Sequence, residues 1–476
     1  MDKLNSLLRQ LFSVEVNNVL NNIEKYSSQI CISKSFKNSI VDTVYKDLCG
    51  LWVQSIKLEN QYIIRTQGVQ YKWKIFDFFS ENEEYRYLFF KKYKALLEIS
   101  NRVINQVESF ISSFIDYMID DFNELKLTFG INSLNVGEFE NLGDRHFGGQ
   151  RTLRVNLDDV DIIFKPRSTT PESFLNCVVA LTELDKYKVL EKEDHGWCQY
   201  LPHDDIEVNE SLHFYLGAMQ ALVHVTSTKD THKENIVIHN SRPYLIDAEC
   251  TISCSMDITN NRFYYSNNIY DYGIIPFYWK DIDYCNRNVS YLGWLYSGLK
   301  FYNDDINLWR QEFLDGFIST YTRLINELDY FECIINHYSN NLNSRIVLRN
   351  TSYYSSLLKL IHNPVYMSKD LMSIELELKA RLYRKGVSQE IVSCEVDALL
   401  NNDIPYFYSP VCQNIIVCDS VKKINIPFKN NLINTFSTSL NKKELNIKMK
   451  KQVEIINIYF DAECFKRKGY SNGNII

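Results

Sequence analysis

The chain has 476 residues, of which 45% are hydrophobic and 23% are charged, as in globular proteins with room for two or three domains. Its net charge of −7 argues against a general nucleic-acid binder, and no apolar run approaches the roughly 18 residues of a transmembrane segment. The N-terminus lacks the pattern of a signal peptide, so we expect a cytoplasmic protein whose twelve cysteines are reduced, mostly buried thiols.

The first 135 residues are predicted to be helical. Apolar side chains, many of them aromatic, recur at three- and four-residue steps over 78–97 and again over 99–122. Glycine and proline are scarce in the whole chain, at 16 and 9 residues, which favours long helices. Such aromatic stripes form a protein core far more often than they line a ligand site, so we expect a packed helical region.

Paired strands are predicted after a glycine-containing turn at 143–149, GDRHFGG. Residues 151–164 form two predicted strands joined at 158–159, Lys165 ends the second strand, and a helix is predicted to begin with Thr170 as its N-cap. The nucleotide lobe of a kinase has the same order, and there the strand lysine contacts the α- and β-phosphates of ATP. The alternative for Lys165 is a solvated cation at a strand end, and the glycine turn matches G-x-G-x-x-G poorly.

Two acidic motifs flank a predicted hairpin over 236–246. The motif DTHKEN precedes the hairpin at 230–235, and the motif DAE follows it. Because a hairpin returns its two ends to the same place, we expect Asp230, Asn235 and Asp247 to converge. The alternative is a polar turn with ordinary capping residues.

Such a convergent set is what phosphoryl transfer from ATP requires. One carboxylate orients or deprotonates the attacking hydroxyl, while an amide and a second carboxylate hold Mg²⁺ against the phosphates. The five-residue step from Asp230 to Asn235 equals the Asp-to-Asn step of the protein-kinase catalytic loop, H-R-D-x-x-x-x-N. His232 follows the aspartate by two positions, as a histidine does in lipid kinases.

Further elements are predicted beyond these motifs. A strand is expected at 196–200 and a helix over 211–225, and helices resume at about residue 306. The Tyr- and Asn-rich stretch 255–300 follows the second acidic motif, where kinases place an activation segment. The last turn of the chain, 466–476, is expected to be loose.

Seven motifs in one order carry a resemblance to a known family. Together they resemble the dehydratase domain of class II lanthipeptide synthetases over roughly residues 60–440. The motifs are GDRHFGG at 143–149, IIFKPR at 162–167, GWCQY at 196–200, DTHKEN at 230–235, PYLIDAE at 243–249, RIVLRNT at 345–351 and DIPYF at 403–407.

The resemblance implies an α+β fold with a two-lobed, lipid-kinase-like core and large helical additions at its N- and C-terminal sides. The expected regions are a helical one at 1–135, the kinase-like core with nucleotide lobe, catalytic loop and activation segment at 136–300, and a helical one carrying elimination residues at 301–476. The chain contains no counterpart of the family's zinc-dependent cyclase, so we expect a stand-alone dehydratase.

The activity that the resemblance implies is modification of a ribosomal precursor peptide with a leader and a Ser/Thr-rich core. The family phosphorylates Ser or Thr with ATP and Mg²⁺ and then eliminates phosphate to leave dehydroalanine or dehydrobutyrine, a step of lanthipeptide (bacteriocin) biosynthesis. Other expected partners are a separate cyclase and a transporter.

The site roles carried over from the family divide into two sets. For phosphorylation, Lys165 is the nucleotide-binding lysine, Asp230 is the catalytic acid with His232 beside it, and the metal ligands are Asn235, Asp247 and Glu249. For elimination, the residues are Asp144, His146, Arg345 and Thr351, with Arg349 as a further phosphate contact. Arginine suits this step because its planar fork binds phosphate through two parallel hydrogen bonds and stays charged.

Several alternatives stay open. Either His146 or an activated hydroxyl takes the α-proton, and the alternative for Arg345 and Arg349 is an ion pair with a surface acid. The chain as a whole is expected to be a dehydratase, with a peptide Ser/Thr kinase that leaves its phosphate in place, or an inactive scaffold that binds leader peptides, as the other two hypotheses. Intact residues of both sets favour the dehydratase.

Overall fold

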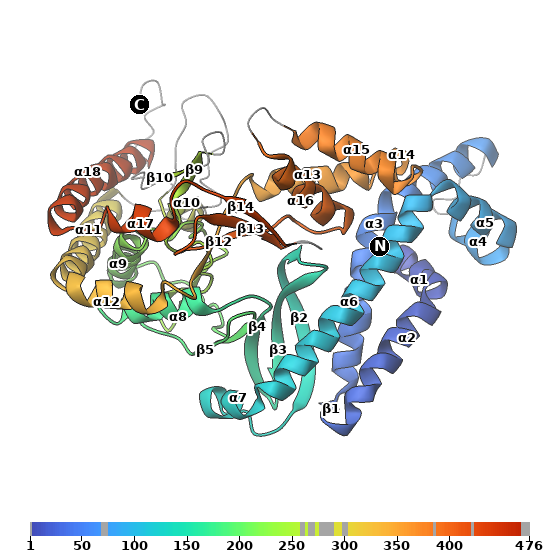
Figure 1. Ribbon diagram of the computed structural model, residues 1–476, viewed down its shortest axis with the longest axis horizontal. Helices are drawn as coiled ribbons and strands as arrows, with labels where there is room; N and C mark the ends of the chain where they lie inside the picture. The colour runs from blue at the N-terminus through green and yellow to red at the C-terminus, as the bar shows by residue number, and fades with distance from the viewer. Residues whose placement is uncertain are drawn as a thin grey trace. The chain divides into compact units, whose positions relative to one another are not determined.

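A computed structural model describes residues 2–67, 75–257, 262–264, 272–275, 290–297, 303–383, 387–419 and 423–467. Helices predominate over strands in this mixed α+β protein (Figure 1). Its chain forms two compact units: the first contains Met1–Pro166, Val347–Phe407 and Val417–Ile426, and the second contains Arg167–Ile346, Tyr408–Ile416 and Pro427–Ile476. The predicted regions 1–135, 136–300 and 301–476 divide the chain by sequence order instead, and they stay a prediction.

The helical character predicted for the first 135 residues is confirmed, with a two-residue strand as the exception before residue 135. The helices there are α1 (Asp2–Leu11), α2 (Ser13–Glu24), the 3₁₀ turn η1 (Lys25–Ser28), α3 (Lys34–Gln67), α4 (Ile75–Glu81), α5 (Glu83–Lys92), α6 (Lys94–Asp120) and α7 (Phe122–Phe129). The first unit is completed by α13 (Thr351–Ile361), α14 (Pro364–Met367), α15 (Leu371–Leu382) and α16 (Gln389–Leu400).

The strands of the first unit lie side by side in the order β1-β2-β3-β4. They are β1 (Cys31–Ile32), β2 (Asn135–His146), β3 (Gln150–Leu157) and β4 (Val160–Lys165). The turn predicted at 158–159 is confirmed: Asp158 and Asp159 have φ of 52° and 63°, as the two central residues of a type I′ turn require. Strand β2 was not predicted, because its polar sequence NVGEFENLGDRH shows weak alternation.

Aromatic side chains fix α6 on this sheet. Phe164 of β4 lies 5.2 Å from Phe114 and 6.1 Å from Tyr117 between ring centroids, and both of these residues belong to α6. Phe36 of α3 packs at 5.4 Å against Phe139 of β2 and at 6.2 Å against Phe114. The stripe predicted over 99–122 therefore forms core, as expected from its spacing, and it supports the strand that ends in Lys165.

The second unit combines helices with short antiparallel pairs of strands. Its elements up to residue 264 are α8 (Thr170–Val179), β5 (Val189–Glu191), β6 (Gly196–Gln199), α9 (Glu210–Val225), β7 (Ile236–His239), β8 (Arg242–Leu245), β9 (Ser255–Asp257) and β10 (Arg262–Tyr264). It continues with α10 (Tyr291–Ser297), α11 (Asn303–Asn326), α12 (Leu328–Tyr338), β11 (Asn343–Arg345), α17 (Leu432–Ser437) and α18 (Lys442–Arg467). Strand β12 (Phe407–Pro410) pairs with β11, and β13 (Ile415–Asp419) and β14 (Lys423–Pro427) follow it along the chain.

Helices α9 and α11 approach each other at two glycines. A Cβ atom added to Gly217 of α9 would lie 1.9 Å from the carbonyl oxygen of Phe313, and one added to Gly316 of α11 would lie 1.9 Å from the carbonyl oxygen of Phe214. Neither position therefore accepts a side chain without separating the helices. Since α9 ends shortly before Asp230, this close contact between the two helices fixes the start of the segment that carries Asp230.

Most local predictions in the second unit hold, and one is wrong by a residue. The strand at 196–200 and the helix over 211–225 correspond to β6 and α9. The N-cap of α8 is Thr169 rather than Thr170, because the Thr169 hydroxyl donates to the Leu190 carbonyl at 3.1 Å and ties the cap to the neighbouring β5. The predicted activation segment falls largely outside the described residues, as does most of the tail predicted to be loose at 466–476.

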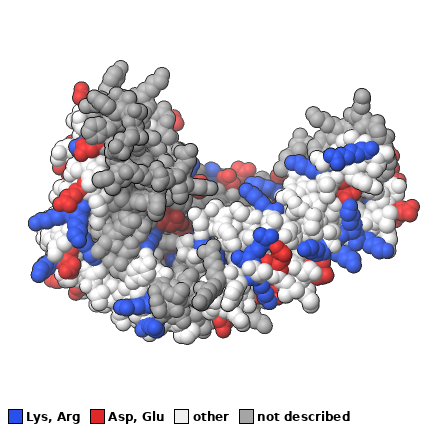
Figure 2. All heavy atoms as spheres, turned by 90° about the horizontal axis from the view of Figure 1, so that it is seen from above, with Lys and Arg blue, Asp and Glu red and all other residues white. Residues whose placement is uncertain are grey.

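Charged side chains are interspersed on the molecular surface. On the face shown in Figure 2, Lys and Arg side chains lie among Asp and Glu side chains, in keeping with the modest net charge of −7. Within the described ranges, none of the helices combines the length and the apolar composition that a membrane-spanning helix needs.

Candidate functional site

The hairpin predicted between the two acidic motifs is present in the second unit. Strands β7 and β8 are antiparallel, with Ile236 opposite Leu245 and His239 opposite Arg242. The loop residues, at 240 and 241, have φ of 50° and 60°, which is the two-residue turn that suits the twist of a hairpin. Buried residues alternate with partly exposed ones along both strands, so one face of the hairpin is fixed in the core.

The structure brings Asp230, Asn235 and Asp247 together, as the hairpin predicts. The Asn235 side-chain amide donates from Nδ2 to the Asp230 carbonyl oxygen at 2.8 Å. The backbone amide of Ile246 donates to the Asn235 carbonyl oxygen at 3.0 Å, which places Asp247 beside the same turn. Since the amide nitrogen of Asn235 is committed to Asp230, its Oδ1 atom is the one left to act as a ligand or acceptor.

Asp230 has an unusual backbone and an unusual electrostatic environment. Its φ of 62° lies in the left-handed region, which aspartate tolerates better than most residues. His232 Nε2 lies 3.4 Å from its Oδ1. Burial raises the pKa of Asp230, with Asp247 and Glu249 acting in the same direction and His232 and Arg345 acting against it. The carboxylate is still 41% exposed, so solvent weakens this effect while preserving its direction.

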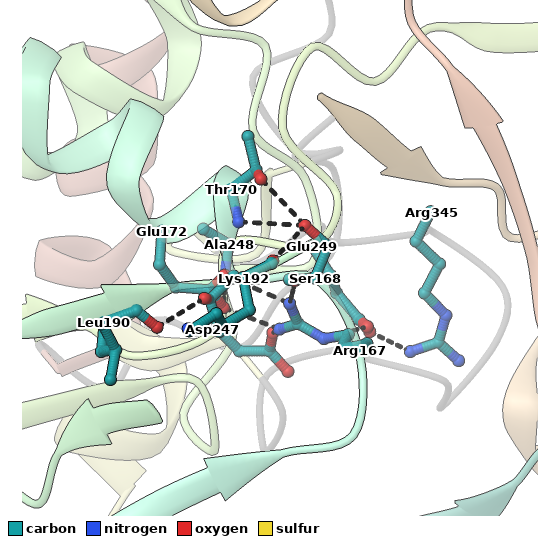
Figure 3. A network of polar contacts seen from close by, with 11 residues as sticks. Arg167, Ser168, Thr170, Glu172, Leu190, Lys192, Asp247, Ala248, Glu249 and Arg345 are labelled. Atoms are coloured by element: carbon teal, nitrogen blue, oxygen red, sulfur yellow. Dashed lines mark hydrogen bonds and ion pairs between the residues drawn. The ribbon is translucent and has the colours of Figure 1, made fainter. Parts of the chain in front are cut away.

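Arg167 holds three acids at the end of the hairpin (Figure 3). Its guanidinium donates to Glu172 at 2.7 Å and to Asp247 at 2.5 Å, and its Nε lies 3.2 Å from Glu249. Glu172, on the first turn of α8, has a fully buried side chain. Because a buried carboxylate without a partner is costly, the ion pairs with Arg167 compensate the charge of these acids. The pKa of Arg167 is raised well above its usual value by Glu172, Asp247 and Glu249, against the effect of burial.

Glu249 links this group to Arg345. An ion pair joins the Arg345 guanidinium to Oε1 of Glu249, and the Arg345 backbone amide donates to the Glu249 carbonyl oxygen at 2.7 Å. Arg345 is the last residue of β11, and its side chain reaches Glu249 at the end of the hairpin. The ion pair that we kept as the alternative for Arg345 therefore exists, but its partner is the buried Glu249 rather than a surface acid.

We call the residues that meet here the hairpin cluster, defined as Arg167, Glu172, Asp230, His232, Asn235, Asp247, Glu249 and Arg345. The sequence reasoning missed Arg167 and Glu172. A signal existed, because Arg167 belongs to the quoted motif IIFKPR and Glu172 stands in the first turn of the predicted helix. Only Lys165 of that motif received a role, since the arginine has no counterpart in the kinase pattern that guided the assignment.

The glycine turn, 143–149, belongs to the first unit. Phe147, Gly148 and Gly149 have φ of 48°, 79° and 89°, so the chain reverses through three successive left-handed residues. Asp144 is exposed to solvent, whereas His146 is half-buried. His146 Nδ1 lies 2.7 Å from the carbonyl oxygen of Ile404, in the motif DIPYF.

Buried polar contacts hold the turn in place. Arg145 forms ion pairs with Asp47 of α3 and with Asp403, and its guanidinium donates to Gln106 of α6 at 2.6 Å. Asp403 in turn accepts from the backbone amide of Gly148 at 2.7 Å. The motif DIPYF was noted in the sequence without a role, and these contacts show that it anchors the turn.

The other candidates of the first unit have diverse surroundings. Arg349 donates to Glu395 of α16 at 2.5 Å and to the Leu382 carbonyl oxygen at 2.7 Å, so its partner is a fully buried acid and not a surface one. Thr351 is the first residue of α13, directly after the N-cap Asn350. Lys165 is buried at the end of β4. The roles assigned to these residues stay predictions.

The donor set at the hairpin suits a hard divalent cation. Asp247 and Glu249 supply carboxylate oxygens and Asn235 supplies an amide oxygen, which is the ligand chemistry of Mg²⁺. The guanidinium of Arg167 already lies against both carboxylates, so a metal ion would compete with it for them. Across the part of the chain that the structure describes, no group of three or more His, Cys, Asp and Glu side chains is arranged to hold a metal by itself. Magnesium needs no such group, since it commonly binds through one or two carboxylates together with phosphates and water.

Comparison with known proteins identifies the family. The model of the family described as "Domain of unknown function (DUF4135)" matches residues 93–300 and 299–410, which is more than half of the sequence, and the chain belongs to this family.

A curated relative gives the family a context. The chain is 21% identical over 336 residues to the lacticin 481/lactococcin biosynthesis protein LcnDR2 of Lactococcus lactis subsp. lactis. The match covers 58% of this chain and 36% of that protein, so the chain corresponds to about a third of the relative's length.

Proposed function

We propose that this protein is a peptide dehydratase of lanthipeptide maturation. It transfers phosphate from ATP to Ser or Thr of a ribosomal precursor peptide and then eliminates that phosphate. The observation that carries the proposal is the hairpin cluster, where Asp230, the Asn235 amide and two further carboxylates meet beside Arg345. An acid, an amide and a second acid around one hairpin are the parts that phosphoryl transfer requires.

The comparison supports the biological context. LcnDR2 is described as a protein of lacticin 481 and lactococcin biosynthesis. The residues matched by the family model, 93–300 and 299–410, include the quoted motifs. The relative's role in biosynthesis of lacticin 481 and lactococcin supports a precursor peptide as the substrate. A separate cyclase and a transporter are proposed from the resemblance of the sequence motifs alone. The order of glycine turn, strands, lysine, helix and hairpin along the chain supports a lipid-kinase-like core, which we propose as the fold.

In the phosphorylation step, we assign the proton acceptor to Asp230. Its carboxylate accepts the proton of the substrate hydroxyl as the oxygen–phosphorus bond forms. Burial raises the pKa of Asp230, which makes the carboxylate a stronger base than an exposed aspartate. His232, 3.4 Å from Oδ1, orients this carboxylate. Lys165 is proposed to bind the ATP phosphates as the counterpart of the strand lysine of kinases.

Mg²⁺ would be held by Asp247, Glu249 and Oδ1 of Asn235. When bound, the ion neutralises the charge of the phosphates and of the oxygen that leaves. Arg167 compensates the negative charge of Asp247 and Glu249 and holds both carboxylates in place. Arg345 shares Glu249 with Arg167, so rearrangement of that one carboxylate changes the environment of both arginines.

The elimination step needs a base for the α-proton and cations for the leaving phosphate. The base takes the proton from Cα, the electron pair becomes the Cα=Cβ double bond, and the Cβ–O bond breaks to release inorganic phosphate. Arg345 is proposed to bind the leaving oxygens, because a guanidinium stabilises the charge that develops there. Asp144, His146, Arg349 and Thr351 are proposed as further elimination residues.

A mass measurement tests the function. The protein is incubated with ATP, Mg²⁺ and a Ser/Thr-rich precursor peptide, and the products are examined by mass spectrometry together with ADP release. Loss of one water for each modified residue is the expected result. Gain of one phosphate without loss of water would instead establish a kinase, and an unchanged peptide with no ADP would favour a scaffold. The same peptide made with phosphoserine isolates the second step, since its dehydration requires no transfer from ATP.

A further inference from the structure

We propose that Asp403 and the Ile404 carbonyl form a positioning clamp that fixes the glycine turn and selects the tautomer of His146, leaving Nε2 as the unprotonated ring nitrogen that accepts the α-proton. The inference rests on the proposed dehydratase function for the chemistry of His146, whereas the clamp itself is independent of it. All residues involved belong to the first unit, and Asp403 and Ile404 are separated from the turn by about 250 positions of sequence.

Asp403 receives three donors in a buried place. Its Oδ2 accepts from the backbone amides of Gly148 at 2.7 Å and Gly149 at 3.2 Å, and its Oδ1 accepts from Arg145 Nε at 3.2 Å. The side chain is only 2% exposed. Burial raises the pKa of Asp403, while Arg145 and the two amides oppose that rise by stabilising the carboxylate. A carboxylate that receives successive amides of a left-handed turn holds the backbone of that turn directly.

The following residue adds a second tie between the same segments. The backbone amide of Ile404 donates to the Arg145 carbonyl oxygen at 2.8 Å, and the Ile404 carbonyl oxygen lies 2.7 Å from His146 Nδ1. A carbonyl oxygen only accepts, so Nδ1 must carry the proton in this contact. The neutral imidazole has one N–H, and consequently its Nε2 is unprotonated and basic.

Aromatic packing holds the ring in that orientation. The Tyr406 ring lies 5.2 Å from the His146 ring and 4.8 Å from the Phe147 ring, both in edge-to-face geometry. Arg145 connects the turn to helices α3 and α6 through its contacts with Asp47 and Gln106. The motif DIPYF therefore restrains His146 with one carboxylate, one carbonyl and one aromatic ring.

This arrangement assigns the α-proton to His146 and not to an activated hydroxyl. In the step, Nε2 takes the proton from Cα, the electron pair forms the double bond as the Cβ–O bond breaks, and phosphate departs with the electrons of that bond. The imidazolium then returns its proton to solvent. Asp403 touches neither substrate nor the reacting atoms in this scheme, and it acts by holding the turn.

The first experiment reads the tautomer in the unmodified protein without any substrate. The full chain is labelled with ¹⁵N-histidine, the His146 signals are assigned by their disappearance in His146→Gln, and the ring nitrogens report which one carries the proton. We expect Nδ1 to be protonated and Nε2 unprotonated in the neutral ring. An Nε2–H tautomer would overturn the proposal, whatever the enzymatic activity proves to be.

The second experiment uses Asp403→Asn, with Asp370→Asn as the matched control. Asp370 is an exposed helix N-cap of the same unit, whose side chain accepts from the Ser373 amide at 2.8 Å. In Asp403→Asn we expect the His146 signals to shift toward the Nε2–H form and dehydration of a phosphoserine peptide to slow by at least about tenfold, with phosphorylation by ATP within about twofold. Asp370→Asn should change neither.

A folded Asp403→Asn protein with unchanged tautomer and unchanged dehydration would refute the clamp. If that variant does not fold, Tyr406→Leu tests the same restraint from the aromatic side with the same two readouts. Failure of the proposed function looks different, because the unmodified protein would then neither phosphorylate the peptide nor dehydrate the phosphopeptide, while the tautomer measurement keeps its meaning.

Discussion

The hairpin cluster and the glycine turn are both charged chain reversals, but they are held in different ways. Side chains hold the hairpin cluster: one arginine, Arg167, bonds three acids, and a second one, Arg345, shares Glu249 with it. The glycine turn is held at its backbone, because the Asp403 carboxylate accepts from two of its amides. The Ile404 carbonyl binds the His146 ring, and Arg145 adds ion pairs to Asp47 and Asp403. Ion pairs between side chains exchange partners readily, whereas a carboxylate bound to successive amides keeps one geometry.

The difference indicates what each region is suited to do. Under the proposed function, a metal ion would replace the guanidinium of Arg167 as the cation beside the carboxylates of the hairpin cluster. The glycine turn suits a task that needs one fixed proton acceptor. A kinase step followed by an elimination step requires both properties, and changes at the two regions should therefore separate the steps.

The largest expected effect comes from Asp230→Asn. Loss of the proton acceptor should slow phosphorylation by about 10² to 10⁴-fold, the usual contribution of general base catalysis. Dehydration of a phosphoserine peptide should change far less, and ADP release with mass spectrometry measures both. Asp185→Asn is the control, since Asp185 of the same unit is a half-exposed acid that lies 3.7 Å from Arg242. Equal losses in both variants would remove the special role of Asp230.

Arg345→Ala should slow elimination more than phosphorylation, the reverse of the effect expected for Asp230→Asn. Phosphopeptide is expected to accumulate, because removal of one group that stabilises the departing charge costs about 10² to 10³-fold in rate. Phosphorylation should fall less, through the partner that Glu249 loses. Arg323→Ala, which removes a half-exposed arginine paired with Glu183, serves as the control. Full dehydration by Arg345→Ala would exclude the arginine from elimination.

Arg167→Gln should lower the free energy of unfolding by about 3 kcal/mol, because it removes the cation from buried Glu172 and its neighbours. The same change should tighten binding of Mn²⁺ several-fold, since the guanidinium no longer competes for Asp247 and Glu249. Urea unfolding and Mn²⁺ titration by electron paramagnetic resonance measure the two effects. Arg310→Gln, at a pair in which Asp461 is 54% and Arg310 is 23% exposed, should cost less than about 1 kcal/mol. Unaltered stability and Mn²⁺ binding in Arg167→Gln would contradict this account of the cluster.

A smaller effect concerns pH. Burial lowers the pKa of His213 to about 4, of His224 to about 3 and of His362 to about 4. The unfolded chain binds protons at these positions below about pH 6.5 while the folded chain does not, so stability should fall as the pH drops from 6.5 toward 4. His362→Gln, whose amide can still donate to Asn402, should remove about a third of this loss in urea titrations at pH 7 and pH 4.5. An unchanged pH dependence would show that His362 is not protonated on unfolding.

The sequence predicts what depends on neighbouring residues. Apolar residues on both sides of a short polar loop predict the hairpin at 236–246, and the same reasoning predicts the turn at 158–159. The convergence of Asp230, Asn235 and Asp247 follows from that hairpin, since its ends must meet. The aromatic stripe of α6 is equally local, because its period alone identifies the buried face.

The parts that were missed depend on contacts distant in sequence. The bond from Arg167 to Asp247 spans 80 positions, and the bond from Gly148 to Asp403 spans 255. Neither leaves a local pattern, because an arginine or an aspartate in a polar segment has many exposed alternatives. The N-cap of α8 moved by one residue for the same reason: Thr169 finds its acceptor on β5, 21 positions away. Strand β2 was missed for another reason: its pairing with β3, the next strand along the chain, stabilises a sequence with little strand character of its own.

The two glycines at which α9 meets α11 have a consequence for motion. With backbone against backbone at Gly217 and Gly316, no layer of side chains exists there that could repack and let one helix slide along the other. Helix α9 runs straight into the segment that bears Asp230, so a displacement of that carboxylate along the helix axis must carry α11 with it. Under the proposed function, adjustment to a bound peptide would then come from the loops and arginines around Asp230. The aspartate itself would keep its position, because α9 and α11 form a rigid pair.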